Sequence, residues 1–550
     1  MRPINAFFRG FNAVYQKAEN GYARLIGGMV RHSAITAIVG LIIIGVAGYG
    51  ISRVATGFIP IEDQGYMLAA VQLPDGAALG RTQAVLEELA KKAKETPGVD
   101  QVITIAGISA LDNNATLANA GLAYIVLKDW AERGKGEDLP SLYKNLNANL
   151  GSTGEARVIV LPPPAIQGIG NAAGFTMQIE LRDGSFDLAK LQGSLNAVVE
   201  TAETQSGIQR ISAPFRSSVP QYKVEVDREK VQALGLTTDQ VFSTLASYLG
   251  SSYVNQFNKF GRVFQVYVQG DAQYRLTPES ILTLTVRNKN GDMIPLGTMM
   301  TITPSVGPAL ISLYNLYPSA SVIGVPNTGF SSGDAIKLME QIAADKLPPG
   351  TGTEWTALSY QEKIVGGQLY LVFGLALLLV YLVLAGQYES WYLPVAVLLA
   401  APLSLVGPVS VLAGLHIDNN LYVQIGLILL IALSAKNAIL IVEVARELRI
   451  AGKPIVESAI EASRARFRPI LMTSFAFILG VAPLVVATGA GASARKSIGI
   501  TVFSGMIAST CLAVLFVPAF FVVMQHIEEW RGSRKKKPAP GATTAETHQG

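Results

Sequence analysis

Hydrophobic residues gather in six long runs along the chain, and polar segments separate them. The runs cover residues 33–51, 367–386, 391–415, 422–444, 469–488 and 498–524. A helix needs about 20 mostly apolar residues to cross a hydrocarbon layer roughly 30 Å thick, because each residue adds about 1.5 Å of rise. The pattern therefore predicts six transmembrane helices.

Basic residues indicate how these helices are oriented. Lys and Arg are frequent before the first run, between the fourth and fifth runs, and after the sixth run. An even number of helices separates these three segments, so they lie on one side of the membrane. The positive-inside rule makes that side cytoplasmic, with Arg495 and Lys496 as exceptions on the other side. We therefore expect a multi-pass membrane protein, with residues 52–363 forming a large extracytoplasmic region.

The two ends of the chain have patterns of their own. Residues 1–32 predict an amphipathic helix on the cytoplasmic membrane surface; the alternative is an ordinary helix packed on a core. The apolar face of this helix consists of Phe7, Phe8, Phe11, Val14 and Tyr15. Residues 531–550 predict a disordered basic tail in the cytoplasm. No removable signal peptide is expected.

The extracytoplasmic region repeats a strand–helix–strand pattern. Val71–Gly80 resembles Ile179–Leu188, and a looser copy covers Ser319–Gly350. Two βαβ units form a split βαβ, ferredoxin-like sandwich. We therefore expect a membrane α-helical protein that also carries α+β subdomains. Between the second and third copies, the alternating strand Val263–Gly270 predicts an exposed hairpin, which suits either a docking surface or an ordinary β-ribbon.

Composition excludes several classes of protein. The chain has 550 residues, of which 15% are charged, below the roughly 25% typical of soluble proteins. Its net charge of +4 is too small to indicate nucleic-acid binding. Cys511 is the only cysteine and there are four histidines, so neither a disulfide nor a Cys/His metal site is expected. The sequence lacks the phosphate-binding motif G-x-x-x-x-G-K-[ST], and we expect neither ATP nor another cofactor.

Lys436 is the most informative residue because it lies deep in the fourth apolar run. A charge at that depth costs roughly 2.5–3.5 kcal/mol on insertion scales. Its amine either snorkels to an interface or takes part in a proton-controlled ion pair. No Asp or Glu lies in the core of any of the six runs, and Asn437 can hydrogen-bond but cannot neutralise a charge. We therefore expect the counter-charge to come from another polypeptide.

Two residues at the start of the fifth run extend this hypothesis. Arg466 and Thr473 are seven positions apart and share one face of a helix. A basic group at the cytoplasmic mouth with a hydroxyl further in suits a proton path. Both also have ordinary explanations, since Arg466 is one of several positive-inside residues and a membrane threonine often bonds a carbonyl of its own helix.

Six motifs, in order along the chain, resemble one known family. They are FIPIEDQG (Phe58–Gly65), VLKDWAER (Val126–Arg133), SYQE (Ser359–Glu362), GQYESW (Gly386–Trp391), SAKNAILIVEVA (Ser434–Ala445) and FRPILMTSFAFILGVAPLV (Phe467–Val485). Together they resemble the C-terminal half of the resistance–nodulation–division (RND) transporters, in the hydrophobe/amphiphile efflux branch of AcrB/MexB-like pumps. The similarity covers nearly the whole chain.

The resemblance implies a multidrug efflux pump of a bacterial inner membrane, with residues 52–363 in the periplasm. Such a pump is an antiporter rather than an enzyme, with protons as the coupling ion. The family forms trimers of twelve-span units that work with a periplasmic adaptor and an outer-membrane channel to export amphiphilic small molecules. Lys436 matches the family's relay lysine, Arg466 the arginine at the cytoplasmic proton path and Thr473 the relay threonine, with Asn437 beside them. The family's relay aspartates belong to the N-terminal half, which we therefore expect as a partner.

The resemblance also divides the chain. The first apolar run matches the family's seventh span. Residues 58–166 resemble the first porter subdomain of this half, residues 174–219 with 307–358 the second, and residues 220–306 the docking subdomain that meets the channel.

The substrate pocket departs from that of the best-studied members, which line it with several phenylalanines. The matching positions here are Ile103, Ile108, Ala110 and Tyr124, and Asp112–Ala115 includes a short insertion. We therefore expect a less aromatic pocket with a narrower range of substrates.

Three other functions stay open. A metal exporter of the same superfamily would need more ligands than the pair Met299 and Met300. A lipid-exporting relative would lack the docking hairpin. A truncated or split-gene subunit would transport nothing on its own.

Overall fold

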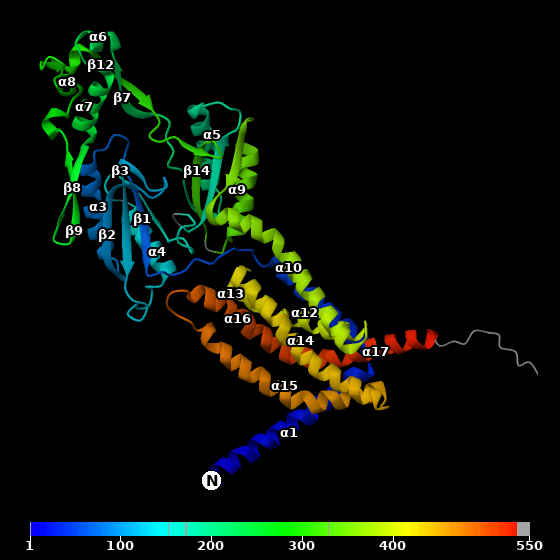
Figure 1. The fold of residues 1–550 in the computed structure, drawn as a ribbon. Coiled ribbons are helices and arrows are strands. Elements are labelled where there is room, and N and C mark those ends of the chain that lie inside the picture. Colours follow the sequence, from blue (N-terminus) through cyan, green and yellow to red (C-terminus); the bar gives the residue numbers. More distant parts are fainter. Residues whose placement is uncertain (1, 152, 171–172, 328, 536–550) are drawn as a thin grey trace, which may run out of the picture. The chain divides into compact units, whose positions relative to one another are not determined.

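The computed structural model describes residues 2–151, 153–170, 173–327 and 329–535 (Figure 1). The chain forms two compact units. The larger comprises Met1–Phe186, Gly193–Pro214 and Tyr314–Gly550, and the smaller comprises Asp187–Gln192 and Phe215–Leu313. The larger unit contains the long apolar helices and two β-sheets, and the smaller unit is inserted within it along the chain.

Six helices of the described residues are long and apolar enough to cross a membrane, as the sequence predicts. They are α2 (Ser33–Arg53), α10 (Ala357–Tyr388), the interrupted helix α11–α12–α13 (Leu393–Leu398, Ala400–Ser404, Val406–Leu415), α14 (Leu421–Ile450), α15 (Ile455–Val485) and α16–η4–α17 (Ala492–Ala508, Ser509–Ala513, Val514–Lys535). Helices α10 and α15 begin well before their apolar runs, because the backbone hydrogen-bond ladder continues through polar turns.

Helix α1 (Arg2–Arg31) precedes α2, and its second half packs on the bundle. Tyr22, Ile26 and Val30 are buried there, and the Tyr22 ring stacks on Phe467 of α15 with ring centroids 4.3 Å apart. The Tyr22 hydroxyl donates a hydrogen bond of 2.9 Å to the carbonyl of Val514. This half of α1 is therefore a helix packed on a core, the ordinary alternative for this segment.

Both predicted end segments fall partly outside the described residues. This applies to residues 536–550 and to the side chains of Phe7, Phe8, Phe11 and Val14. Helix α17 continues to Lys535, so the predicted disorder does not hold for residues 531–535. The helix can extend because the first proline after Pro518 is Pro538.

The first sheet of the larger unit has the element order β-α-β-β-α-β. Its elements are β1 (Tyr66–Gln72), α3 (Leu79–Lys94), β2 (Val99–Ser109), β3 (Ala115–Leu127), α4 (Leu139–Leu150) and β4 (Arg157–Leu161). The strand order is β2-β3-β1-β4, with antiparallel neighbours throughout. Apolar residues of α3 and α4 form one core with the strands. This is a split βαβ arrangement, so the α+β prediction is confirmed.

The second sheet repeats this order with one additional short strand, β13. Its elements are β5 (Phe175–Leu181), α5 (Leu188–Glu203), β6 (Ile208–Ser212), β13 (Ser312–Tyr314), β14 (Tyr317–Pro326), α9 (Ser332–Lys346) and β15 (Thr351–Trp355). Strand β6 pairs with β14, β14 with β5, and β5 with β15, all antiparallel. The second and third sequence repeats therefore share one sheet, although the smaller unit separates them along the chain.

The smaller unit has a core of its own, which includes Val231 and Leu296. Its elements are β7 (Val219–Val226), α6 (Arg228–Ala233), α7 (Thr238–Leu245), η1 (Ala246–Gly250), β8 (Ser252–Lys259), β9 (Arg262–Val268), η2 (Ala272–Tyr274), α8 (Pro278–Leu282), β10 (Thr285–Arg287), β11 (Met293–Pro295), η3 (Leu296–Thr298) and β12 (Met300–Gly307). Strand β7 pairs with β12. Strands β8 and β9 form the predicted hairpin, whose side chains are nearly all exposed.

Candidate functional site

Lys436 lies on an open face of helix α14. Exposed residues of α14 recur at Ile425, Leu429, Ala432 and Lys436, a spacing of i, i+4, i+7 and i+11 that places them on one side of the helix. The Lys436 ammonium group makes no ion pair or hydrogen bond with any residue that the structure describes. Within the described chain, Lys436 is therefore a cation exposed on an apolar bundle.

Asn437, the next residue along α14, points into the bundle. It is 3% exposed, and its Nδ2 has no hydrogen-bond partner among the described residues. The hydroxyl groups of Ser434 on α14 and Ser474 on α15 are also buried without a partner in the described chain. Both helices thus bring polar groups into the bundle interior, where buried water is the usual partner of such groups.

Arg466 and Thr473 lie on α15, which packs against α14. Thr473 is exposed, and its hydroxyl donates a 3.1 Å hydrogen bond to the carbonyl of Ile470, the ordinary alternative for this residue. The Nε of Arg466 is buried without a partner among the described residues. No hydrogen bond joins these two residues to Lys436, so the predicted relay residues occupy neighbouring helices without forming a connected path.

Close packing fixes α14 against α16. A Cβ atom at Gly505 of α16 would lie 2.3 Å from Cδ2 of the buried Leu430 on α14, so the glycine allows the two helices to approach closely. Asn420 caps the N-terminus of α14, and its Nδ2 donates a 3.2 Å hydrogen bond to Oγ of Ser497 on α16. Helices α14 and α16 consequently form one tightly packed pair, with Lys436 on its outer face.

Two other basic residues of these helices, Arg449 and Arg464, have acidic partners. Arg449 of α14 donates hydrogen bonds of 2.8 and 2.9 Å to the carboxylate of Glu529 on α17. Arg464 of α15 lies 3.0 Å from Glu19 of α1. Both pairs are partly exposed, so each contributes only about 0–1 kcal/mol. Lys436 differs from these residues in having no such partner within the described chain.

Three of the four residues predicted to line a substrate pocket lie on the first sheet or directly beside it. Ile103 of β2 and Tyr124 of β3 are directly opposite each other, so their side chains share a face of the sheet. Tyr124 packs with Ala110 in an apolar cluster that also contains Val325 of β14. Ile103 is 53% exposed at the margin of this group. The cluster therefore joins the two sheets of the larger unit.

Ile108 and the insertion lie near the end of the β2–β3 hairpin. Ile108 is half-buried and opposite Thr116. Residues 110–114, where the sequence predicts an insertion, form the turn, and Asn113 and Asn114 have φ values of 51° and 60°. A tight hairpin turn needs this left-handed conformation, which asparagine tolerates. Ile108 thus lies near the end of β2, two positions before Ala110.

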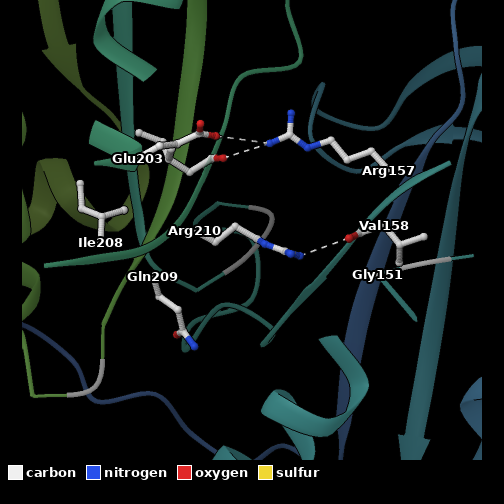
Figure 2. A pocket seen from close by; sticks show the side chains of 8 residues that line it. Gly151, Arg157, Val158, Glu203, Ile208, Gln209 and Arg210 are labelled. Carbon is white, nitrogen blue, oxygen red and sulfur yellow. Dashed lines mark hydrogen bonds and ion pairs between the residues drawn. The ribbon is translucent and has the colours of Figure 1, made fainter. Parts of the chain in front are cut away.

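A polar cavity of about 340 Å³ was not predicted from the sequence. It is lined by Gly151, Arg157, Val158, Glu203, Ile208, Gln209, Arg210 and Ile211 (Figure 2). Arg210 of β6 donates to Oδ1 of Asn147 at 2.9 Å and to the carbonyl of Val158 at 3.2 Å, and Arg157 of β4 lies 3.9 Å from Glu203 of α5. Each arginine reaches from one sheet to the other. The signal that marks them is a charged residue within a short apolar strand.

Metal ligands do not cluster in the described part of the chain, where no group of three or more His, Cys, Asp or Glu side chains could hold an ion. Cys511 is exposed and free.

Comparison with known proteins agrees with the motifs. The sequence profile of the AcrB/AcrD/AcrF family matches residues 2–525. The chain is 38% identical over 524 residues to the toluene efflux pump membrane transporter TtgB of Pseudomonas putida, which covers 95% of this chain and 49% of TtgB. It is also 38% identical to two Escherichia coli proteins, the multidrug export protein AcrF (96% of this chain, 52% of AcrF) and the multidrug resistance protein MdtF (95% and 50%).

The chain thus spans about half the length of the curated relatives it matches. The family profile, by contrast, matches nearly the whole of this chain. The protein therefore belongs to the AcrB/AcrD/AcrF family of RND efflux transporters.

Proposed function

We propose that this chain is one half of a proton-driven multidrug efflux pump in a bacterial inner membrane, equivalent to the C-terminal half of its relatives. The second six-helix half belongs either to a longer chain or to a separate polypeptide. The efflux functions in the relatives' names and the six apolar helices support transport. The observation that carries the proposal is Lys436, a cation exposed on the bundle without a counter-charge in the described chain.

The cost of an unpaired charge supports a missing partner. Lys436 against lipid would cost roughly 2.5–3.5 kcal/mol on insertion scales. The exposed stripe through Ile425 and Leu429 gives a second half a surface to pack on. Carboxylates on that half would neutralise Lys436 and offset this cost. The relay aspartates expected from the family are groups of this kind.

Protonation of such carboxylates supplies the coupling step. It removes their charge, so the attraction for the Lys436 ammonium falls and α14 can shift against the partner half. Each proton that enters down the membrane potential releases about 2.3 kcal/mol per 100 mV. Arg466 and Thr473 then serve at the cytoplasmic entrance, on the helix next to α14.

The periplasmic parts follow from the same proposal. The two sheets form porter subdomains whose apolar cluster, with Ile103, Ala110 and Tyr124, contacts amphiphilic substrates. The smaller unit, with its exposed hairpin, docks toward an outer-membrane channel. A trimer of complete units, assisted by a periplasmic adaptor, completes the assembly.

Dye efflux from cells tests the proposal. The chain is expressed with and without the matching second half, and efflux is measured before and after a protonophore. We expect protonophore-sensitive efflux only with both halves. Lys436→Met should reduce it at least tenfold, whereas Lys453→Met, which removes a partly exposed lysine paired with Glu461, should leave it unchanged. Full efflux by the Lys436→Met variant, or by this chain alone, contradicts the proposal.

A further inference from the structure

The linker between α2 and β1 supplies a cap that helix α16 lacks. Helix α16 starts at Ala492, and its N-cap Gly491 offers no side chain to the free N–H groups of the first turn. The carboxylate of Glu62 accepts hydrogen bonds from the N–H groups of Ser493 at 3.1 Å and Ala494 at 2.6 Å. Glu62 is 9% exposed and lies 431 positions away from Ser493. A buried carboxylate thus holds the positive end of the helix dipole.

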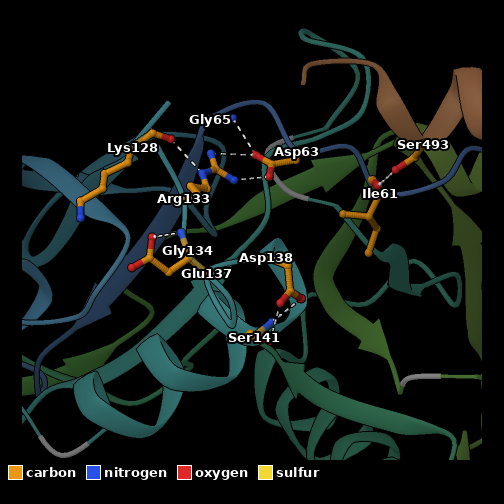
Figure 3. A network of polar contacts seen from close by, with 10 residues as sticks. All are labelled: Ile61, Asp63, Gly65, Lys128, Arg133, Gly134, Glu137, Asp138, Ser141 and Ser493. Carbon is orange, nitrogen blue, oxygen red and sulfur yellow. Dashed lines mark hydrogen bonds and ion pairs between the residues drawn. The ribbon is translucent and has the colours of Figure 1, made fainter. Parts of the chain in front are cut away.

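The serine of the same turn strengthens this attachment. The Ser493 hydroxyl donates a 3.1 Å hydrogen bond to the carbonyl of Ile61, the residue before Glu62 (Figure 3). Two consecutive linker residues therefore bind the first turn of α16 through backbone and side-chain groups.

Asp63, the next residue, is bound to the first sheet instead. Its carboxylate forms an ion pair with Arg133, whose side chain is 6% exposed, and accepts a 3.0 Å hydrogen bond from the N–H of Gly65 (Figure 3). Arg133 in turn donates a 2.8 Å hydrogen bond to the carbonyl of Lys128, directly after β3, and its guanidinium lies 5.6 Å from the ring centre of Trp130. Asp63 is thereby anchored to the end of β3.

No flexible residue separates the contact of Glu62 with α16 from the contact of Asp63 with Arg133. Glu62 and Asp63 are adjacent, so their Cα atoms are about 3.8 Å apart. After Asp63, the side chain of Gln64 donates to the carbonyl of Pro164 at 2.8 Å, and the carbonyl of Gly65 accepts from the N–H of Leu127 at 2.8 Å. The linker thus joins the sheet at once. A displacement of the α16 terminus must either move the sheet or break a buried charged contact.

Helix α16 is also the packing partner of the helix that carries Lys436. The close contact between Gly505 and Leu430 and the hydrogen bond from Asn420 to Ser497 tie α16 to α14 along its length. The described chain therefore contains a continuous path of contacts from α14 to α16, to Glu62 and Asp63, and to Arg133. Such a path is the physical medium in which two sites can be coupled.

We propose that Glu62 and Asp63 are the coupling residues that transmit movement of helix α16 to the sheet β2-β3-β1-β4. In the pump this transmission links proton-driven shifts of α14 to the substrate-binding sheet, and in that respect it rests on the proposed function. The residues touch neither protons in transit nor substrate. Their role is to position one element relative to the other.

Hydrogen exchange on the full chain in lipid nanodiscs tests this coupling without transport. Asp63→Asn removes the charge that binds Arg133 and leaves the contacts of Glu62 in place, yet it should speed exchange at the amides of Ser493 and Ala494 at least tenfold. Glu62→Gln should likewise speed exchange at residues 128–133, because energetic coupling is reciprocal. Glu155→Gln, which breaks an exposed ion pair with Arg81 on the same subdomain, should change neither region. Changes confined to each variant's own side overturn the proposal.

Transport by the complete two-half unit in proteoliposomes separates coupling from folding. Glu62→Gln and Asp63→Asn should lower the number of substrate molecules exported per proton at least fivefold, with proton entry continuing and the unfolding temperature within a few degrees of the parent. An unchanged ratio overturns the proposal, and so does a parallel loss of both fluxes. If exchange is reciprocal but the parent unit exports nothing when a proton gradient is applied, the proposed function has failed and the coupling stands.

Discussion

Helix α13 approaches α16 so closely at Gly407 that one methyl group tests the packing of the bundle. A Cβ atom at Gly407 would lie 2.1 Å from the carbonyl oxygen of Ser504, 2.5 Å from its carbonyl carbon and 3.0 Å from Cβ of Ala508. The oxygen and carbon belong to the backbone, so no rotamer change can relieve the contact. An ordinary carbon–oxygen contact needs about 3.3 Å, and Gly407→Ala therefore forces the helices apart by roughly 1 Å.

The free-energy cost of Gly407→Ala follows from comparison with a second glycine of α13, Gly414. A Cβ atom at Gly414 would meet nothing within 4 Å, and this residue is exposed. Gly→Ala in a helix stabilises by up to about 1 kcal/mol, and both variants gain it. The difference between them is then the overpacking cost, about 1–3 kcal/mol, and contact with backbone places Gly407→Ala near the upper end.

Thermal unfolding in detergent, followed by tryptophan fluorescence, ranks the variants. Gly414→Ala should unfold at or slightly above the parent's temperature, and Gly407→Ala several degrees below it. Equal unfolding temperatures for Gly407→Ala and Gly414→Ala would refute the reasoning, because the packing of α13 on α16 would then have room for a methyl group.

Three further outcomes are expected. Burial, and then the charge of Asp334, raise the pKa of the Asp418 carboxyl above its ordinary 3.8. The protonated carboxyl therefore favours the folded state at low pH, and this contribution is lost as the pH rises through the raised pKa. Asp418→Asn should consequently raise the unfolding temperature at pH 8 but not at pH 4. Tyr22→Phe keeps the ring stack but loses a buried hydrogen bond, and chemical denaturation should show a loss of about 1 kcal/mol. Ile103→Phe places a ring opposite Tyr124. In transport assays, the half-saturating concentration for flat aromatic substrates should be several-fold lower than in the parent, and aliphatic substrates should not show this decrease.

The helices were predictable because each apolar run approaches the thickness of a bilayer, a signal that no local turn preference can cancel. Their ends were not, since helix α15 continues through the charged residues before Pro469 without any change in its hydrogen-bond ladder. The packing of Tyr22 on Phe467 also escaped prediction. It depends on the meeting of segments far apart in sequence, and the pattern of residues 1–32 alone is equally satisfied by a membrane surface.

The candidate site shows the same limit. The energetic cost of a charge in lipid singled out Lys436, and this argument needs only its position in an apolar run. Which face of α14 it occupies could not be predicted, because the run is apolar on every side. Arg157 and Arg210 were missed because their partners lie on another sheet. Glu62 belongs to the motif FIPIEDQG, but its contact with Ala494 spans 432 positions, and no periodic pattern in the sequence indicates it.

Lys436 and the Glu62–Asp63 pair make opposite demands on the same bundle. A cation that alternates between paired and unpaired states needs a helix that can move, whereas α14 is held to α16 by glycine-mediated packing and by the bond from Asn420 to Ser497. Both demands are met if α14 and α16 move together as one body. The movement of this helix pair then reaches the sheet from the N-terminus of α16, where Glu62 is bound. Tight packing within the helix pair is thus a condition for coupling, because a compliant contact between α14 and α16 would absorb the displacement before it reached the sheet.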